Sequence, residues 1–474
     1  MMSRRRKPAI GIGAGRRGPA FLRMSIIWPS AERKGHPDAW TRRDVLRGGA
    51  MALAAACAGG CATNPVTGRR QLMLMSSDDE IRLDRAQSPH QFSADFGPVR
   101  DPALNAYIAE VGQSLTPHTH RPRMPYSFRG VNASHVNAYA FPGGSIAVTR
   151  GLLAAMDTEA QLAALLGHEL GHVSARHTAE RMTQAALAGL VVAGLAAAAA
   201  QKDERYGPWA MGLGGVGAGL LLARYSRDDE RQADDLGMHY ARQAGYPPSG
   251  MIGLMDILRR LAGRQPNVVE QMFASHPMSE ERYQAALARS RRPEFAASGA
   301  QPDRAERYLD ATARVRAQRP AIEAIQQGDR ALARGDAAAA AERYRAALAA
   351  VPDDYEATLK LARCRLAAGQ FAEAHRLAQA AFQAYPEEPQ SLHVGGFASL
   401  RMGRWDAAVA EFEEYERRLP GNPNTIFLIG LAQEGRGRRP EAVEHYRRFL
   451  AAGGGGDYGA HARQRLAEWG VATP

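Results

Sequence analysis

The sequence predicts two parts with different architectures: a mostly helical α+β domain with a small sheet over residues 61–300, and an all-α repeat solenoid over residues 321–455. Three observations predict this division. A helical pattern at residues 165–173 contains H-E-x-x-H, two strand-like runs precede it, and the C-terminal part repeats every 34 residues. A chain of 474 residues is too long for one ordinary core, and 45% hydrophobic with 23% charged residues suits a globular protein.

The net charge of +11 is concentrated at the N-terminus. Residues 1–60, the leader, hold twelve Lys or Arg and three acidic residues, a balance of +9 that leaves +2 for the rest of the chain. A nucleic-acid partner therefore loses its main support, and we expect none. Only three cysteines occur, two of them near the leader's end, so a disulfide framework is excluded.

The leader has the pattern of an export signal. Arg42 and Arg43 precede a short apolar run at residues 50–58, which ends shortly before Cys61 and is too short to span a bilayer. The paired arginines resemble a twin-arginine signal, and the small residues before Cys61 resemble a lipoprotein cleavage site. We expect export to the periplasm and a lipid anchor on Cys61 in the outer membrane. Cys57 is the rival lipidation site, and simple secretion is the alternative.

The first domain begins with a helix and two strand-like runs. A helical pattern starts at Asp101-Pro102, a favourable cap, and runs to Leu115. Strand-like runs follow at 126–131 and 145–149, separated by a turn-rich stretch at 137–144. A strand directly before the next helix could pair with an extended peptide through its free backbone groups, and an ordinary edge strand is the alternative.

The next helix carries H-E-x-x-H, and Thr158 with Gln161 predicts its N-terminal cap. Because residues four apart share a helix face, His168 and His172 can both present imidazole nitrogens to one metal ion. Glu169 would then stand where a carboxylate can take a proton from a water molecule. A solvated helix face is the alternative, but apolar residues at helical spacing predict burial, which requires partners for these polar groups.

A third ligand is needed, because a catalytic zinc usually takes three protein ligands and leaves one position open. The best candidates lie on a helix capped by Ser226, where Glu230 and Asp234 are four residues apart on one face. Glu230 could bind the metal while Asp234 holds a ligand histidine. A charged solvated face is the alternative, because neighbouring residues are acidic too, and spacing alone does not select Glu230.

Two apolar runs, rich in Ala and Gly, lie between the two ligand helices at residues 185–200 and 210–223. Each is shorter than the roughly 20 residues that span a bilayer. We expect a packed helical hairpin or a mobile cover near the cleft, with shallow membrane contact as the alternative.

The C-terminal part repeats with a period of 34 residues, which is the tetratricopeptide period. The turn glycines that define it are Gly335, Gly369, Gly403 and Gly437. We predict four repeats over 321–455, a linker and hinge at 301–320, and a capping helix within 456–474. The concave face of such an array usually binds a peptide or protein, and structural support of the first domain is the alternative.

Three motifs follow one another in the chain: His168-Glu169-x-x-His172, then Ser226-Arg227-x-x-Glu230-x-x-Ala233-Asp234, then Ser275-His276-Pro277 with Arg282 downstream. In this order they resemble the gluzincin metallopeptidases of HtpX and the CAAX prenyl proteases, and especially the periplasmic BepA type with C-terminal tetratricopeptide repeats. The resemblance covers roughly residues 61–290. It implies a zincin-like fold for the predicted zinc metallopeptidase domain, 61–300.

The resemblance also implies roles for individual residues. His168, His172 and Glu230 would bind one Zn²⁺ per chain, with Glu169 as the general base and Asp234 supporting a ligand. The segment from Asn137 to Thr149 would form the substrate-side edge of the cleft. The predicted substrate-binding residues there are Asn137, Gly144, Ser145 and Ile146.

His276 has two possible roles under this resemblance. In the BepA type, the corresponding histidine can occupy the fourth zinc position and hold the enzyme off. His276 would be either such an inhibitory ligand or a donor to the oxyanion of the tetrahedral intermediate. Without the resemblance, a lone His before Pro is more often a loop or core residue. Arg282 could stabilise the same charge, and a structural ion pair is the alternative.

These expectations combine into one functional hypothesis. The protein would be a lipid-anchored zinc endopeptidase of the bacterial envelope that degrades misfolded or stalled outer-membrane proteins. Its repeats would bind protein substrates or the outer-membrane protein assembly machinery. The alternative is an envelope assembly chaperone whose zinc site is structural or held shut by His276.

Overall fold

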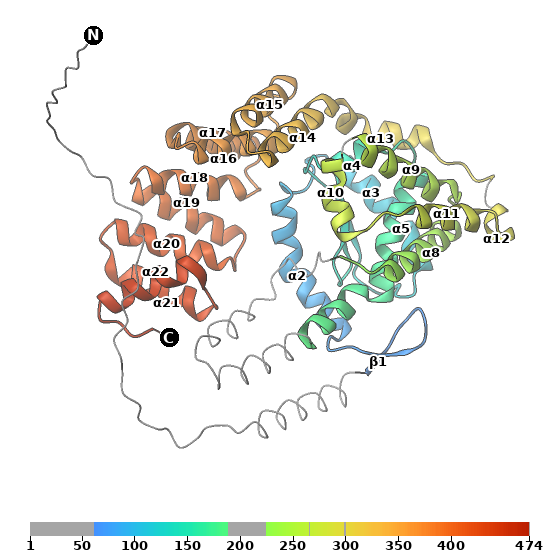
Figure 1. The fold of residues 1–474 in the computed structure, drawn as a ribbon, viewed down its shortest axis with the longest axis horizontal. Helices are drawn as coiled ribbons and strands as arrows, with labels where there is room; N and C mark the ends of the chain where they lie inside the picture. Colours follow the sequence, from blue (N-terminus) through green and yellow to red (C-terminus); the bar gives the residue numbers. More distant parts are fainter. Residues whose placement is uncertain (1–60, 188–223, 265, 298–299, 474) are drawn as a thin grey trace, which may run out of the picture.

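The computed structural model describes residues 61–187, 224–264, 266–297 and 300–473 (Figure 1). They form an α+β domain followed by a helical solenoid, which confirms the predicted fold class. The leader with Cys57 lies outside the described residues, as do nearly all of the two apolar runs. Within the described ranges, no helix is both long enough and apolar enough to cross a bilayer.

A short hairpin opens the described chain and contacts the centre of the first domain. β1 (Cys61–Thr63) pairs antiparallel with β2 (Arg70–Leu72). Asn64 holds the turn: its Oδ1 accepts a hydrogen bond of 2.9 Å from the Val66 amide, and its Nδ2 donates at 3.2 Å to the carbonyl of Ala175. The hairpin that starts at Cys61 is therefore fixed to the end of helix α5.

The sheet of the first domain has three strands. The central strand β5 (Ser145–Thr149) pairs in parallel with β3 (Ser127–Val131) and antiparallel with β4 (Ala138–Ala140). β3 and β4 are therefore the edges of this sheet. The described helices of this domain are α2 (Ser77–Ala94), α3 (Pro102–Leu115), the 3₁₀ helix η1 (Thr116–His118), α4 (Arg150–Ala155), α5 (Glu159–Ala175), α8 (Arg227–Gln243), α9 (Ser249–Arg264), α10 (Pro266–Ser275), α11 (Glu280–Ser290) and α12 (Pro293–Ala296).

Helix α5 is the buried centre of this domain. All its residues except Gln161 are buried. Its N-terminus has the predicted capping box: the Thr158 side chain accepts from the Gln161 amide at 3.2 Å, and the Gln161 side chain accepts from the Thr158 amide at 3.3 Å.

Glycines bring α5 and α8 into backbone contact. A Cβ added at Gly237 of α8 would lie 2.7 Å from the backbone nitrogen of His168, and one at Gly167 of α5 would lie 2.8 Å from the carbonyl oxygen of Gly237. Neither position can carry a side chain without moving the helices apart. The glycines thus set the distance between the two helices that carry the candidate ligands.

Residues 301–320 differ from the predicted linker and hinge. They contain helix α13 (Ala305–Ala317), which buries Tyr308 and Val315, and the Tyr308 hydroxyl donates at 2.6 Å to the carbonyl of Leu153. Polar and charged residues cover the other faces of this helix, so its narrow buried stripe was not apparent from composition. This corrects the linker prediction, because α13 packs on the first domain.

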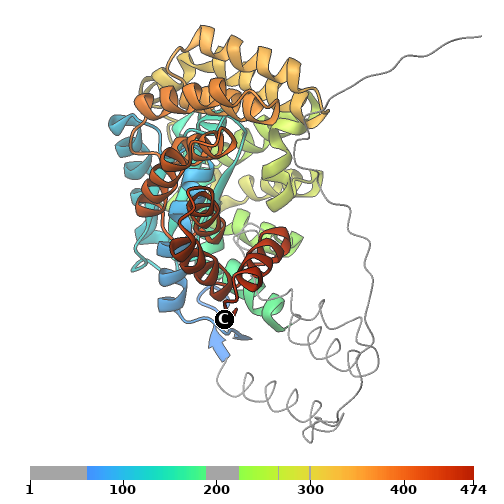
Figure 2. The same cartoon turned by 90° about the vertical axis from the view of Figure 1, so that its left-hand side faces the viewer.

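The solenoid has four helix pairs, in agreement with the predicted period. The pairs are α14 (Arg319–Ala333) with α15 (Ala337–Ala350), α16 (Tyr355–Ala367) with α17 (Phe371–Ala384), α18 (Gln390–Arg401) with α19 (Trp405–Arg418), and α20 (Pro423–Gly435) with α21 (Arg439–Ala451). Helix α22 (Gly456–Glu468) follows the last pair and buries Leu466 against it. The pairs form an arc beside the first domain, and the turned view shows them crossing in front of it (Figures 1 and 2).

A buried ion network joins the solenoid to the first domain. Arg150 of α4 lies 2.6 Å from Asp354 and 2.8 Å from Glu356, which begin the second repeat. Glu356 also accepts a hydrogen bond of 2.8 Å from the Ser134 hydroxyl. The Arg150 side chain is only 5% exposed, so its charge depends on these two carboxylates for compensation.

Replacing Arg150 should therefore weaken the interface between the first domain and the solenoid. We expect Arg150→Ala to lower the free energy of unfolding by about 3 kcal/mol, because it leaves the Asp354 carboxylate buried without its counter-charge. Urea-induced unfolding measures this change. Arg314→Ala is the matched control, since Arg314 is 83% exposed, lies 3.8 Å from Asp101 and lines the same cavity as Arg150. Equal effects of the two substitutions would contradict the account.

Candidate active site and metal centre

The two histidines of α5 meet at one point beside α8. Nε2 of His172 lies 3.1 Å from Nε2 of His168, and both side chains are buried. The spacing of four residues places them on one helix face, as predicted.

Helix α8 brings a carboxylate to the same point. Oε1 of Glu230 lies 3.3 Å from Nε2 of His172, and Oε2 lies 3.7 Å from Nε2 of His168. Ser226 caps this helix through a capping box with Asp229, as its sequence predicts. Of the acidic residues on this helix, Glu230 is the one that joins the two histidines.

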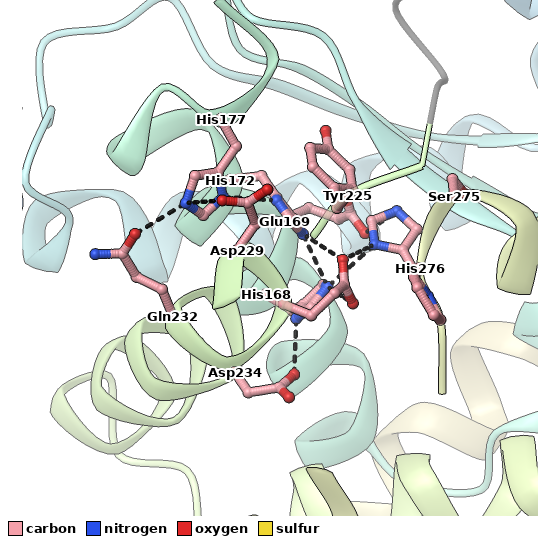
Figure 3. Close-up of polar contacts among 12 residues, drawn as sticks. His168, Glu169, His172, His177, Tyr225, Asp229, Gln232, Asp234, Ser275 and His276 are labelled. Carbon is pink, nitrogen blue, oxygen red and sulfur yellow. Dashed lines mark hydrogen bonds and ion pairs between the residues drawn. The ribbon is translucent and has the colours of Figure 1, made fainter. Parts of the chain in front are cut away.

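His276 completes the cluster from the end of α10. Its Nδ1 lies 2.9 Å from Oε1 of Glu230 and 3.3 Å from Nε2 of His168 (Figure 3). The Tyr225 amide donates at 2.9 Å to the carbonyl of Ser275 and so holds this segment in place. The structure therefore brings the four predicted metal ligands together.

This cluster can hold a metal ion. One ligand atom from each of the four residues lies within 4.8 Å of all the others, and all four side chains are buried. Imidazole nitrogens with a carboxylate oxygen are ligands that suit a divalent ion such as zinc. A neutral imidazole carries a proton on only one of its two nitrogens, so the facing nitrogens of these three buried imidazoles cannot all be hydrogen-bonded to one another. A metal ion bound between them would satisfy these nitrogens.

Glu169 lies beside the cluster but has no hydrogen bond within the described residues. Both of its carboxylate oxygens are buried and unpaired, and Oε1 lies 3.9 Å from Nε2 of His276. Burial raises the pKa of the Glu169 carboxyl above its ordinary value, although the neighbouring His276 and His168 oppose the shift. A buried carboxylate with a raised pKa and free oxygens is suited to accept a proton from water near neutral pH.

Asp234 fixes one of the histidines. Its Oδ1 lies 3.0 Å from Nδ1 of His168, and Arg282 donates to both of its oxygens at 2.7 Å. Burial would raise the pKa of Asp234, but Arg282 and His168 outweigh it and lower the pKa. The ionised carboxylate accepts the Nδ1 proton of His168, which leaves Nε2 of His168 free to bind a metal.

Arg282 is held by the site. Besides Asp234, it contacts Oε2 of Glu230 at 2.6 Å and donates to the carbonyl of Pro277 at 3.0 Å. These contacts are those of a structural ion pair, which was one of the two roles expected for Arg282 from the sequence. A direct role of Arg282 toward the oxyanion stays a prediction without support from its observed geometry.

The predicted substrate-binding residues lie in or next to the sheet. The Ser145 amide donates at 2.8 Å to Asp84, and Ile146, in the central strand, pairs with a neighbour on each side. The Asn137 amide donates at 3.0 Å to the Thr149 hydroxyl, and Gly144 has φ of +106° in the turn before β5. Because β5 is paired on both sides, the strand at 145–149 is neither an edge strand nor free to pair with a peptide, which corrects that expectation. An added peptide strand would have to use one of the edges, β3 or β4, and substrate binding here stays a prediction.

Two residues beside the cluster were not found from the sequence. The ring of Tyr225 stacks on His172 with 3.8 Å between centroids, and Nδ1 of His177 lies 2.9 Å from Nδ1 of His172. Tyr225 lies next to the Ser226 motif, but no spacing rule links it to α5. A residue five positions after His172 would point elsewhere on a continuous helix, so periodicity gave no signal for His177.

Both parts of the chain match known protein families. Residues 102–290 match the model of peptidase family M48, and residues 331–393 and 398–457 match tetratricopeptide repeat models. The family match includes all four ligands of the cluster, Glu169 and Arg282.

Curated relatives match less than half of this chain. The beta-barrel assembly-enhancing protease of Yersinia pestis is 30% identical over 210 residues, which are 43% of this chain and 41% of that protein. Metalloprotease LoiP of Escherichia coli is 35% identical over 162 residues, 34% of this chain and 61% of LoiP. The mitochondrial metalloendopeptidase OMA1 of Schizosaccharomyces pombe is 27% identical over 223 residues, 46% of this chain and 63% of OMA1. The chain thus spans less than two thirds of each relative.

The cluster predicts which acidic residue of α8 is needed for metal binding. We expect Glu230→Ala to reduce the bound metal from about one ion per chain to a small fraction, because it removes the ligand that closes the cluster. Inductively coupled plasma mass spectrometry of dialysed protein measures this. Asp228→Ala is the matched control: Asp228 lies two residues away with an 83% exposed side chain. Metal loss in the control, or metal retention in Glu230→Ala, would contradict the assignment.

Proposed function

Because residues 102–290 are a peptidase family M48 domain, we propose that this chain is a zinc-dependent endopeptidase of the bacterial cell envelope. The observation that carries this proposal is the unpaired, buried carboxylate of Glu169 beside a cluster of three imidazoles and one carboxylate. Neither oxygen of Glu169 accepts a hydrogen bond from a described residue, so we assign it a role toward a bound molecule.

The chain's own residues divide the chemistry between them. His168, His172 and Glu230 would hold the zinc ion, which supplies Lewis-acid chemistry to the peptide carbonyl and the attacking water. Glu169 accepts the proton of the attacking water and then passes it to the nitrogen of the leaving amine. Asp234, locked by Arg282, keeps His168 in the tautomer that can bind the ion.

The proposed location is the periplasm, with a lipid anchor on Cys61 in the outer membrane. The export pattern of the leader supports this, and the chain is fixed to α5 three residues after Cys61. An anchor there would tether the catalytic helix with almost no linker.

We propose misfolded or stalled outer-membrane proteins as the substrates. The name of the Yersinia relative, a beta-barrel assembly-enhancing protease, supports this class. The repeats would bind such proteins or the machinery that assembles them, as concave repeat surfaces commonly do.

A second candidate function is an assembly chaperone whose catalytic site is closed by His276. The position of His276 favours it, since Nδ1 of His276 lies among the ligand atoms of His168 and Glu230. A histidine in the fourth position would exclude the attacking water. The protein would then bind its clients through the repeats and cleave them only after His276 withdraws.

Glu169→Gln should separate chemistry from metal binding. We expect unchanged zinc content and at least a 100-fold loss of casein cleavage, because the amide cannot accept the proton of the attacking water. Glu110→Gln, a 67% exposed site in the same domain, is the control and should cleave normally. Undiminished proteolysis by Glu169→Gln would contradict the mechanism. Full rescue of envelope defects by this variant in cells lacking the protein would favour the chaperone.

His276→Ala tests whether the site is held shut at rest. We expect basal proteolysis to rise several-fold, because the fourth position becomes open to water. Peptide cleavage at constant zinc content measures this, and the double variant with Glu169→Gln should be inactive. A fall in activity with zinc retained would instead indicate that His276 stabilises the oxyanion.

A further inference from the structure

A chain of hydrogen bonds extends outward from the second metal-site histidine. Nδ1 of His172 lies 2.9 Å from Nδ1 of His177, and Nε2 of His177 lies 2.9 Å from Oε1 of Gln232 on α8 (Figure 3). Asp229 lies farther from the same nitrogen, at 3.6 Å. His177 is only 3% exposed, so its contact with His172 is protected from water, whereas the contact with Gln232 is partly buried.

A break in the helix brings His177 to this position. On a continuous helix, residues five apart differ by about 140° around the axis, so His177 would point away from His172. Helix α5 instead ends at Arg176, whose φ of +62° is left-handed and unfavourable for a residue other than glycine. The turn at Arg176 swings the next residue back beneath the metal site.

The side chain of Arg176 stabilises this unfavourable turn. Its Nε lies 3.1 Å from Oε1 of Glu80, and its Nη2 donates at 2.7 Å to the carbonyl of Met75. Glu80 is fully buried and also binds Arg121 at 2.6 Å. A glycine would adopt the turn more easily but would lose these contacts, which explains an arginine at a strained position.

The positions of the protons follow from the partners. Metal binding through Nε2 of His172 requires its proton to be on Nδ1, and Nδ1 of His177 is the acceptor within reach. His177 must then carry its own proton on Nε2, and the amide oxygen of Gln232 accepts it. The reverse direction would put a proton on Nε2 of His172 and prevent metal binding.

The two ligand histidines therefore have different supports. His168 donates to a carboxylate that Arg282 locks, whereas His172 donates to a neutral imidazole. A neutral acceptor adds no charge to a site that already holds the carboxylates of Glu169 and Glu230. The His177 acceptor fixes the tautomer of His172 through the position of its nitrogen, without an added charge.

We propose that His177 is a positioning residue for the metal site, which holds His172 in the tautomer and orientation that bind the ion. The inference rests on the metal site of the proposed function but not on proteolysis. His177 is not one of the four clustered ligand residues, and its effect passes through His172.

The test compares two substitutions that differ in one hydrogen-bond acceptor. We expect His177→Ala to raise the Kd for Zn²⁺ by roughly 10- to 100-fold, measured by chelator competition on the purified chain. His177→Asn should restore most of the affinity, because its Oδ1 occupies the place of Nδ1 and also accepts a hydrogen bond. The visible spectrum of the Co²⁺ form should change in the Ala variant and return in the Asn variant.

Two further variants make the result decisive. Gln232→Met removes only the outer hydrogen-bond acceptor and should weaken zinc binding less than His177→Ala does. It therefore tests the hydrogen-bond chain from His172 to Gln232 even if His177→Ala does not fold. His239→Ala is the control, since the His239 ring contacts Phe295 in a tilted arrangement and is not one of the clustered ligands, and the Kd of this variant should be unchanged. Wild-type affinity in both His177→Ala and Gln232→Met, or an Asn variant as weak as the folded Ala variant, would overturn the inference. A wild-type chain that binds no zinc would overturn the proposed function as well.

Discussion

The contact between the backbones of α5 and α8 is the constraint on which the site depends. The ligand histidines belong to one helix and Glu230 to the other, so their distance is set by how closely the helices approach. Gly167 and Gly237 remove the side chains that would separate them. A larger residue at either position would move Glu230 away from His168 and His172, and the cluster could no longer share one ion.

Around this contact, each metal-binding side chain is fixed by a group on another element. Asp234 and Arg282 hold His168, while His177 and Gln232 hold His172. The Tyr225 amide holds the segment that carries His276. Fixing ligands in this way reduces the reorganisation needed for binding and keeps the site specific for one geometry. Glu169, which is not one of the metal-binding residues, accepts no hydrogen bond from a described residue, as suits a proton acceptor.

The fold and the inner part of the site could be predicted because they depend on local periodicity. The spacing of four residues places His168 and His172 on one face, and the period of 34 residues predicts the solenoid. Glu230 could be selected only by family resemblance, since nearby acidic residues share its helix. The roles of His177 and Arg150 could not be predicted from the sequence. His177 depends on the left-handed turn at Arg176, and Arg150 on a contact with a residue 204 positions away, and both follow from tertiary packing. Helix α13 was missed because its buried stripe is narrow.

The most direct test of the central claim is the position of the metal ion itself. A crystal of the zinc-loaded protein, measured on both sides of the zinc absorption edge, would locate the ion by anomalous scattering. The account predicts one peak at about 2.0–2.2 Å from Nε2 of His168, Nε2 of His172 and a carboxylate oxygen of Glu230. A peak elsewhere, or no peak in a zinc-loaded crystal, would contradict it.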